Sequence, residues 1–246
     1  NAAIQAICDV GDEVILLEPF YDSYRASVCM AGATVRAVRL EPPHFALDLR
    51  ALELAFSPRT RAIIVNTPHN PTGAVLRPED IRALGELARK HDLWILSDEV
   101  YEDMIFPDVS FASPLDFPEL AERTVIACSI SKSHAAPGFR SGWAAGPEEF
   151  TRRLTLVSEA MLFGIQPFLS DALAVALDEH HPEVQRQRDV FQERAQAMVA
   201  TFAGSSAVKV HMPEGGMFVL ADVRTTGLSG EEFAWKLLDE AGVVTM

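Results

Sequence analysis

The first half of the chain alternates short apolar runs with segments of helical periodicity, and this alternation limits the possible folds more than any other feature. Short runs rich in Val, Ile and Leu are typical of buried strands, and the segments between them carry apolar residues at helical spacing. Strands joined by helices favour an α/β fold, a mainly parallel sheet flanked by helices on both faces. The expected strands are residues 13–17, 34–40, 62–65, 93–97 and 124–128, and the expected helices are residues 21–32, 49–56 and 78–91.

The pattern changes after Pro147, where long helical stretches replace the alternation. We therefore expect a large domain over residues 1–182 and part of a small α+β domain over residues 183–246, entered by a long helix with one apolar stripe. The expected elements of the small domain are a helix over residues 183–202, strands over residues 207–211 and 217–222, and a helix from Gly230.

Both ends of the sequence interrupt an expected element. The chain begins at Asn1, within a helical pattern and without a methionine. It ends within an apolar run, residues 243–246, which predicts a further strand. We therefore interpret the sequence as an internal fragment of a longer protein.

The composition excludes several classes of partner. Acidic residues outnumber basic ones by 35 to 21, so the formal net charge is −14. Such an acidic chain is a poor partner for nucleic acid or an anionic membrane, and no apolar run is long enough to span a bilayer. Cys8, Cys29 and Cys128 are odd in number and widely spaced. They form no metal-ligand pattern and favour free thiols in a cytoplasmic protein.

Polar motifs in loops follow three of the expected strands. They are residues 66–73, Asn-Thr-Pro-His-Asn-Pro-Thr-Gly, residues 98–101, Asp-Glu-Val-Tyr, and residues 129–132, Ser-Ile-Ser-Lys. Each motif alone has a plain structural explanation: a rigid turn, a helix cap beside a tyrosine, or a solvated lysine. The carboxyl ends of parallel strands share one edge of the sheet, where open α/β folds bind ligands. Together the motifs predict a binding site at that edge.

In this order, Asn-Pro-Thr-Gly, Asp-x-x-Tyr and Ser-x-x-Lys, with an arginine eight residues later, resemble the class I/II aminotransferases. The resemblance extends over residues 1–246. Members of this family are fold type I enzymes that use pyridoxal 5'-phosphate (PLP). They move an amino group from an L-amino acid to a 2-oxo acid. The resemblance therefore implies the fold type I large domain, PLP as cofactor, and these two classes of substrate.

The resemblance assigns four residues to the reactive part of the cofactor. Lys132 matches the lysine that holds PLP as a Schiff base and then serves as the base that moves a proton between the substrate Cα and C4'. Asp98 matches the aspartate that keeps the pyridine nitrogen protonated, so that the ring acts as an electron sink. Asn70 and Tyr101 match the pair that hydrogen-bonds the phenolic oxygen. The implied catalytic residues are Lys132, Asp98 and Tyr101.

Four other positions match family residues around the cofactor and the substrate. Ser129 and Arg140 match the phosphate-binding residues, among which the arginine provides a bidentate clamp. Tyr21 falls where the family stacks an aromatic ring on the cofactor, with simple packing as the alternative role. Asn66, together with Asn70, is expected to face the substrate, and for Asn66 a role within the turn is the alternative.

The resemblance further implies a homodimer with active sites at the subunit interface. The apolar residues 161–168 resemble the family segment that approaches the cofactor from the neighbouring subunit, and core packing explains such a run equally well. The family's glycine-rich phosphate turn is expected before Asn1, and its arginine for the substrate α-carboxylate after Met246.

Two other activities share these residues. A PLP-dependent carbon–sulfur β-lyase uses the same lysine, aspartate and arginine, and differs in what leaves after Cα is deprotonated. Aminotransferase-like domains also serve as PLP-sensing modules of transcription regulators, an interpretation that the acidic charge does not support. Among the aminotransferases, residues 131–143 resemble the arginine–pyruvate transaminase branch, while aspartate, alanine and aromatic substrates remain open.

Overall fold

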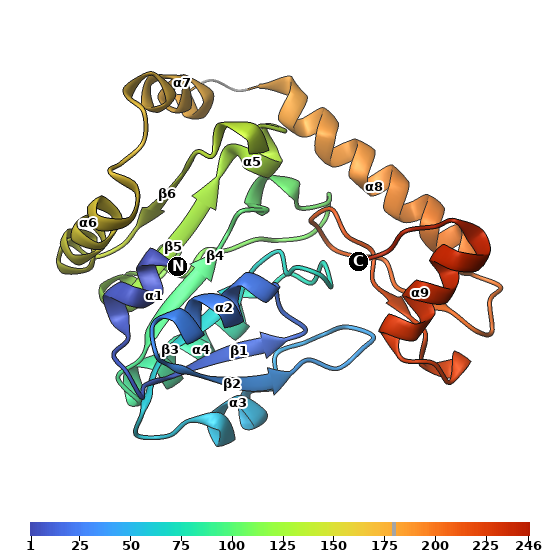
Figure 1. Cartoon of the computed structure of the whole chain (residues 1–246), viewed down its shortest axis with the longest axis horizontal. Helices are drawn as coiled ribbons and strands as arrows, with labels where there is room; N and C mark the ends of the chain where they lie inside the picture. Colours follow the sequence, from blue (N-terminus) through green and yellow to red (C-terminus); the bar gives the residue numbers. More distant parts are fainter. Residues whose placement is uncertain (179–180) are drawn as a thin grey trace.

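The computed structural model describes residues 1–178 and 181–246, and its centre is a six-stranded sheet with the order β2-β1-β3-β4-β5-β6 (Figure 1). Neighbouring strands are parallel from β2 to β5, and β6 is antiparallel to β5. The expected mainly parallel sheet is therefore confirmed, whereas the edge strand β6 was not predicted. The strands of this sheet and of a second, two-stranded sheet are β1 (Glu13–Glu18), β2 (Thr34–Arg39), β3 (Thr60–Asn66), β4 (Trp94–Asp98), β5 (Thr124–Ser129), β6 (Gly142–Ala145), β7 (Lys209–Val210) and β8 (Ala221–Asp222).

Helices cover both faces of the large sheet, as expected. Successive residues of β1 point to opposite faces: Ile15 packs in the cluster that includes α3 and α4, and Leu16 in the cluster that includes α1, α2 and α6. Among the described residues, no helix combines the length and apolar character needed to cross a membrane. The α-helices are α1 (Ala2–Ile7), α2 (Asp22–Met30), α3 (Leu49–Ala55), α4 (Pro78–Lys90), α5 (Ile130–Ser133), α6 (Glu148–Leu162), α7 (Pro167–Asp178), α8 (Pro182–Phe202) and α9 (Gly230–Ala241).

The C-terminal part contains the long helix α8, the small sheet of β7 and β8, and α9. The two strands are short, so the expected strands over residues 207–211 and 217–222 are wrong for most of their length. The connection between them runs along the loop after β4 instead, where Gly216 N–H donates to Met104 O at 3.0 Å. Backbone groups used in this contact are not available to extend β7 and β8.

The expected strand over residues 243–246 is also wrong. Helix α9 ends at Gly242, whose φ of 65° is the left-handed conformation common at helix C-caps. Val244 and Met246 beyond it are exposed. In the described part of the chain these residues lie beside no strand that provides hydrogen-bond partners, so their apolar pattern alone does not make them a strand.

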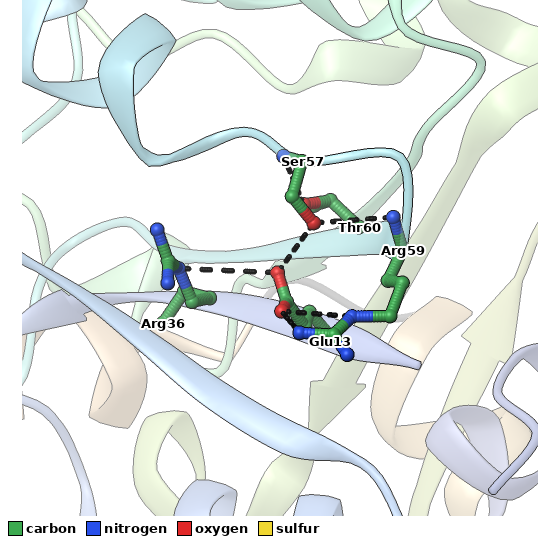
Figure 2. Close-up of polar contacts among 5 residues, drawn as sticks. All are labelled: Glu13, Arg36, Ser57, Arg59 and Thr60. Carbon is green, nitrogen blue, oxygen red and sulfur yellow. Dashed lines mark hydrogen bonds and ion pairs between the residues drawn. The ribbon is translucent and has the colours of Figure 1, made fainter. Parts of the chain in front are cut away.

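A buried carboxylate secures the edge of the sheet opposite the polar motifs. Glu13, the first residue of β1, is only 3% exposed. Ser57 Oγ donates to Glu13 Oε2 at 2.7 Å, Arg59 Nη2 donates to Oε1 at 2.7 Å, and Arg36 Nε lies 3.9 Å from Oε2 (Figure 2). The hydrogen bond from Ser57 is the largest of the influences that hold the pKa of Glu13 below its ordinary value. The carboxylate is therefore charged and well satisfied at neutral pH.

We predict that Glu13→Gln lowers the free energy of unfolding by about 1–3 kcal/mol at pH 7, because charge-assisted hydrogen bonds are lost. The folded-state pKa of Glu13 lies below the unfolded one, so the advantage of wild type is full above the unfolded pKa. It disappears as the pH falls through the folded pKa. Urea denaturation across this pH range measures the difference, with Glu18→Gln at the exposed end of β1 as the control. A stability difference that does not change with pH would contradict the role of the charge.

Candidate active site

The register of the sheet places the three polar motifs beside one another. Asn66 at the end of β3 pairs with Asp98 at the end of β4, which in turn pairs with Ala127 of β5. The third motif starts at Ser129, the last residue of β5. These strands are parallel and adjacent (Figure 1), so the motifs meet at the carboxyl edge of the sheet.

Asp98 is held by a tyrosine from a distant helix. Tyr24 Oη, on α2, donates to Asp98 Oδ2 at 2.6 Å, and Val100 N–H donates to Oδ1 at 3.2 Å. Burial raises the pKa of Asp98, and the bond from Tyr24 is the largest influence in the opposite direction. Because burial disfavours the charged form of this carboxyl group, a further cationic or N–H partner would stabilise that form.

Sequence reasoning assigned no role to Tyr24, although its contact with Asp98 is among the shortest hydrogen bonds at this edge. Burial and the charge of Asp98 raise the pKa of Tyr24 well above its ordinary value, so its hydroxyl stays protonated as a donor. The available signal was its position three residues after Tyr21 in the first turn of α2, where both side chains share one side of the helix.

Asn66 and Asn70 lie in one short loop and are directly linked. Asn70 N–H donates to Asn66 Oδ1 at 2.6 Å, and Asn66 Nδ2 donates to Asp98 O at 2.8 Å. Between them, His69 Nδ1 lies 2.8 Å from Thr72 Oγ1. Burial lowers the pKa of His69 to about 4, so this imidazole is neutral near pH 7. Hydrogen bonds made by its own side chains therefore fix the conformation of this loop.

Tyr101 is buried close to Asp98. Its side chain is 4% exposed, and its ring meets Phe218 edge-on with the ring centres 6.3 Å apart. Burial, followed by the charge of Asp98, raises the pKa of Tyr101 to about 12. The phenol is thus a hydrogen-bond donor at neutral pH, positioned where the C-terminal part of the chain contacts the sheet edge.

Lys132 lies in α5, a single helical turn, so the expectation that it lies in a loop is wrong. The turn forms because Ser129 caps it: Ser129 Oγ accepts from Ser131 N–H at 3.0 Å. Helix α8 holds the other end, where Gln187 Nε2 donates to Lys132 O at 2.5 Å. The half-buried lysine is therefore fixed in backbone position by both the strand β5 and the long helix.

The chain doubles back after α5 and brings Arg140 to the same turn as Ser129. Ser129 Oγ lies 2.8 Å from Ser141 O, the carbonyl next to Arg140. Arg140 is exposed and adopts a left-handed backbone with a φ of 53°. Its Nη1 donates to Pro137 O at 2.9 Å, which uses one of its five donors. Gly142 allows the close return, because a Cβ at this position would lie 2.6 Å from the oxygen of Cys128.

Tyr21 lies in the connection from β1 to α2, on the N-cap position of that helix. Its ring stands perpendicular to that of Tyr24 with the centres 5.6 Å apart, and 51% of its side chain is exposed. The edge-on contact holds the ring in place while leaving much of its surface accessible to a ligand.

The C-terminal part packs against the loop that carries Asn70. Gly73 O accepts from Glu214 N–H at 2.9 Å and from Gly215 N–H at 3.1 Å. Gly73 has a φ of 71°, and a Cβ there would lie 2.3 Å from Pro213 Cβ. Arg77 and Glu214 add an ion pair. Only glycine at position 73 permits both the backbone conformation and this approach.

Residues 1–246 match the sequence profile of the family described as aminotransferase class I and II. The chain belongs to the class I and II aminotransferase family. The family resemblance carried by the three motifs is thereby confirmed.

Relatives and solved structures agree with this membership of the aminotransferases. Arginine–pyruvate transaminase AruH of Pseudomonas aeruginosa is 40% identical over 243 residues, which are 98% of this chain and 62% of that protein. The structure of N-succinyldiaminopimelate aminotransferase from Mycobacterium tuberculosis is 37% identical with a TM-score of 0.91, and the match covers 99% of this chain and 64% of that one. The structure of the aromatic aminotransferase from Pyrococcus horikoshii is 29% identical with a TM-score of 0.95, and the match covers 99% of this chain and 65% of that one. The chain thus spans a little under two thirds of their length.

In this aminotransferase chain we predict that Tyr24→Phe raises the pKa of Asp98, because the hydroxyl that favours the charged carboxylate is removed. The pKa of Asp98 is measured by NMR titration of protein labelled with ¹³C in its aspartate side chains. Tyr21→Phe is the matched control, since it removes a neighbouring hydroxyl and leaves the bond between Tyr24 and Asp98 in place. An Asp98 titration that is the same in wild type and Tyr24→Phe would show that the bond does not tune this carboxylate.

Proposed function

We propose that the protein is a PLP-dependent aminotransferase that moves an amino group from an L-amino acid to a 2-oxo acid. The observation that carries this proposal is the presence of an amine, a half-buried carboxylate and a buried phenol at one sheet edge: Lys132, Asp98 and Tyr101. Family membership and the transaminase activity named for its relatives support the same conclusion.

The side chains at this edge fit the chemistry of PLP. An amine suits its aldehyde, and a buried carboxylate whose pKa is raised by burial suits a protonated pyridine nitrogen, because the cation would relieve the cost of burying the charge. Two donors, from Asn70 and Tyr101, suit the phenolic oxygen. Ser129 and Arg140 share one turn and supply a hydroxyl and a guanidinium suited to a phosphate.

Each side chain has a distinct task in the proposed reaction. Bound PLP would supply an electron sink for the charge left when the substrate Cα loses its proton. Lys132 Nζ would hold the cofactor covalently and be displaced by the substrate amine, and it would then take the proton from Cα and deliver it to C4'. Asp98 would keep a proton on the pyridine nitrogen. Asn70 and Tyr101 would donate hydrogen bonds to the phenolic oxygen.

Two aromatic and polar positions complete the proposed cofactor site. Tyr21 would stack on the pyridine ring, because its own ring is half exposed and is supported edge-on by Tyr24. Asn66 is hydrogen-bonded to the backbone of Asn70, so it borders the proposed site through that residue. No metal takes part in the proposed chemistry.

We propose arginine as the first amino donor and pyruvate as the acceptor to test. The support is the 40% identity to an arginine–pyruvate transaminase, together with the family-like residues 131–143. An acidic protein, with a formal net charge of −14, also favours the approach of a cationic donor.

We predict that the protein incubated with PLP, L-arginine and pyruvate forms alanine, and that Lys132→Ala lowers the rate at least about 100-fold because the base is lost. Lys236→Ala, an exposed lysine on α9, is the matched control and keeps the activity. Borohydride reduction followed by peptide mapping locates the cofactor, which we expect on Lys132. Ammonia in place of alanine would indicate a β-lyase, and a label on another lysine would overturn the assignment.

We also propose that the protein acts as a homodimer. In residues 161–168, at the junction of α6 and α7, large apolar side chains face solvent: Phe163 is 99% exposed, Leu162 69% and Phe168 68%. Contiguous apolar surface of this kind marks an interaction site. A second copy that covers this segment accounts for its exposure, and the core-packing alternative finds no support in these values.

We predict that sedimentation velocity finds a dimer and that Phe163→Glu raises its dissociation constant at least about tenfold, because a charge replaces an apolar anchor. Trp235→Glu is the control, since this residue on α9 is also exposed, at 60%, but lies outside the segment. A monomer that carries full activity would contradict the dimer proposal.

Two further assignments belong to the proposal. Residues 1–182 and 183–246 form a large and a small domain, which the separate six-stranded and two-stranded sheets support. The protein is cytoplasmic, which agrees with Cys8, Cys29 and Cys128 being free thiols.

A further inference from the structure

We infer that Asn66 is a positioning residue whose side-chain amide sets the spacing between Asn70 and Asp98. This role rests on the proposed function, in which Asp98 would bind the ring nitrogen and Asn70 the phenolic oxygen of the cofactor. The amide is 5% exposed and is engaged on both sides, with Asn70 N–H 2.6 Å from its oxygen and Asp98 O 2.8 Å from its nitrogen.

The orientation of the amide is unambiguous because both partners are backbone groups. A backbone N–H only donates and a carbonyl only accepts, so the oxygen of Asn66 faces Asn70 and its nitrogen faces Asp98. Asn66 ends β3 directly opposite Asp98 on β4. The Asp98 carbonyl also accepts from Thr67 N–H at 3.1 Å. The Asn66 amide thus donates a second hydrogen bond to the Asp98 carbonyl and links it to the loop that carries Asn70.

Few other side chains can make this connection. An amide carries a donor and an acceptor on two different atoms at a fixed separation, and asparagine is the shorter of the two amide side chains. Aspartate in its place keeps an acceptor for Asn70 N–H but turns an oxygen toward the Asp98 carbonyl. Alanine loses both bonds. The two substitutions therefore separate the loop contact from the strand contact.

The consequence concerns the geometry of the cofactor site. The side chain of Asn70 donates to the phenolic oxygen in the proposed function, and Asp98 binds the ring nitrogen. Placing these groups correctly matters because a displacement of about 1 Å can lower a rate by about 100-fold. Asn66 acts through its two neighbours, and its amide is committed to them rather than free to bind the substrate.

The first test needs no cofactor. Hydrogen exchange of the Asn70 amide, followed by NMR, is expected to speed up roughly 2- to 12-fold in Asn66→Ala, the equivalent of one hydrogen bond. In Asn66→Asp the acceptor remains, so exchange at Asn70 stays close to wild type. Thr67→Val is the matched control: it removes the buried hydroxyl that accepts from Leu76 N–H at 3.1 Å in the same loop but leaves the amide of Asn66 intact. Unchanged exchange at Asn70 in Asn66→Ala overturns the inference.

The second test uses the PLP-bound protein. Weakening the donor to the phenolic oxygen is expected to raise the pKa of the visible absorbance band by about 0.4–1 pH units, with kcat reduced about 10- to 100-fold and KM changed less. Asn66→Ala should show this, and Thr67→Val should not. Faster exchange without a shifted absorbance titration would mean that Asn66 only stabilises the loop. A wild-type protein that forms no visible band would defeat the proposed function, while the exchange result would still decide the contact itself.

Discussion

Parallel pairing of β3, β4 and β5 is the constraint on which the rest of the structure depends. The register that sets Asn66 against Asp98 and Asp98 against Ala127 fixes where each strand ends. The sheet therefore brings the motifs that follow these strands to one place. No direct contact between the motifs is needed for this. Helices on both faces bury the strands, and the salt-bridged Glu13 secures the opposite edge. The chemistry at the carboxyl edge therefore depends on sheet geometry first and on side chains second.

The electrostatics around Asp98 depend on the burial of its carboxylate and on its hydrogen bond to Tyr24. Burial alone would favour a neutral Asp98, and the bond from Tyr24 partly reverses this. The same burial raises the pKa of Tyr24 and of Tyr101, so both phenols stay protonated and act as donors. Asp98 is thus an acceptor flanked by two neutral donors, and a cationic partner would stabilise its charged form.

Much of this was predictable from the sequence, because the information is local. Fully buried strands appear as continuous apolar runs, and the order of strands and motifs is enough to predict that the polar residues converge. The rest depends on contacts between distant segments. Tyr24 and Asp98 are 74 residues apart in the sequence, so their hydrogen bond exists only in the folded chain. The single turn that holds Lys132 needs Gln187 from α8, and short β7 and β8 reflect the contact of Gly216 with the loop after β4.

The close packing at Gly73 has an evolutionary consequence. A side chain at this position would meet Pro213, and the backbone of the following residues bonds to the Gly73 carbonyl. Neither segment can change shape alone, because each forms part of the other's surface. Substitutions around position 73 and around position 213 are therefore expected to covary among related sequences, although the two stretches are far apart in the gene. Exchange of C-terminal parts between related enzymes is constrained in the same way, since a foreign C-terminal segment must carry a loop that fits this glycine.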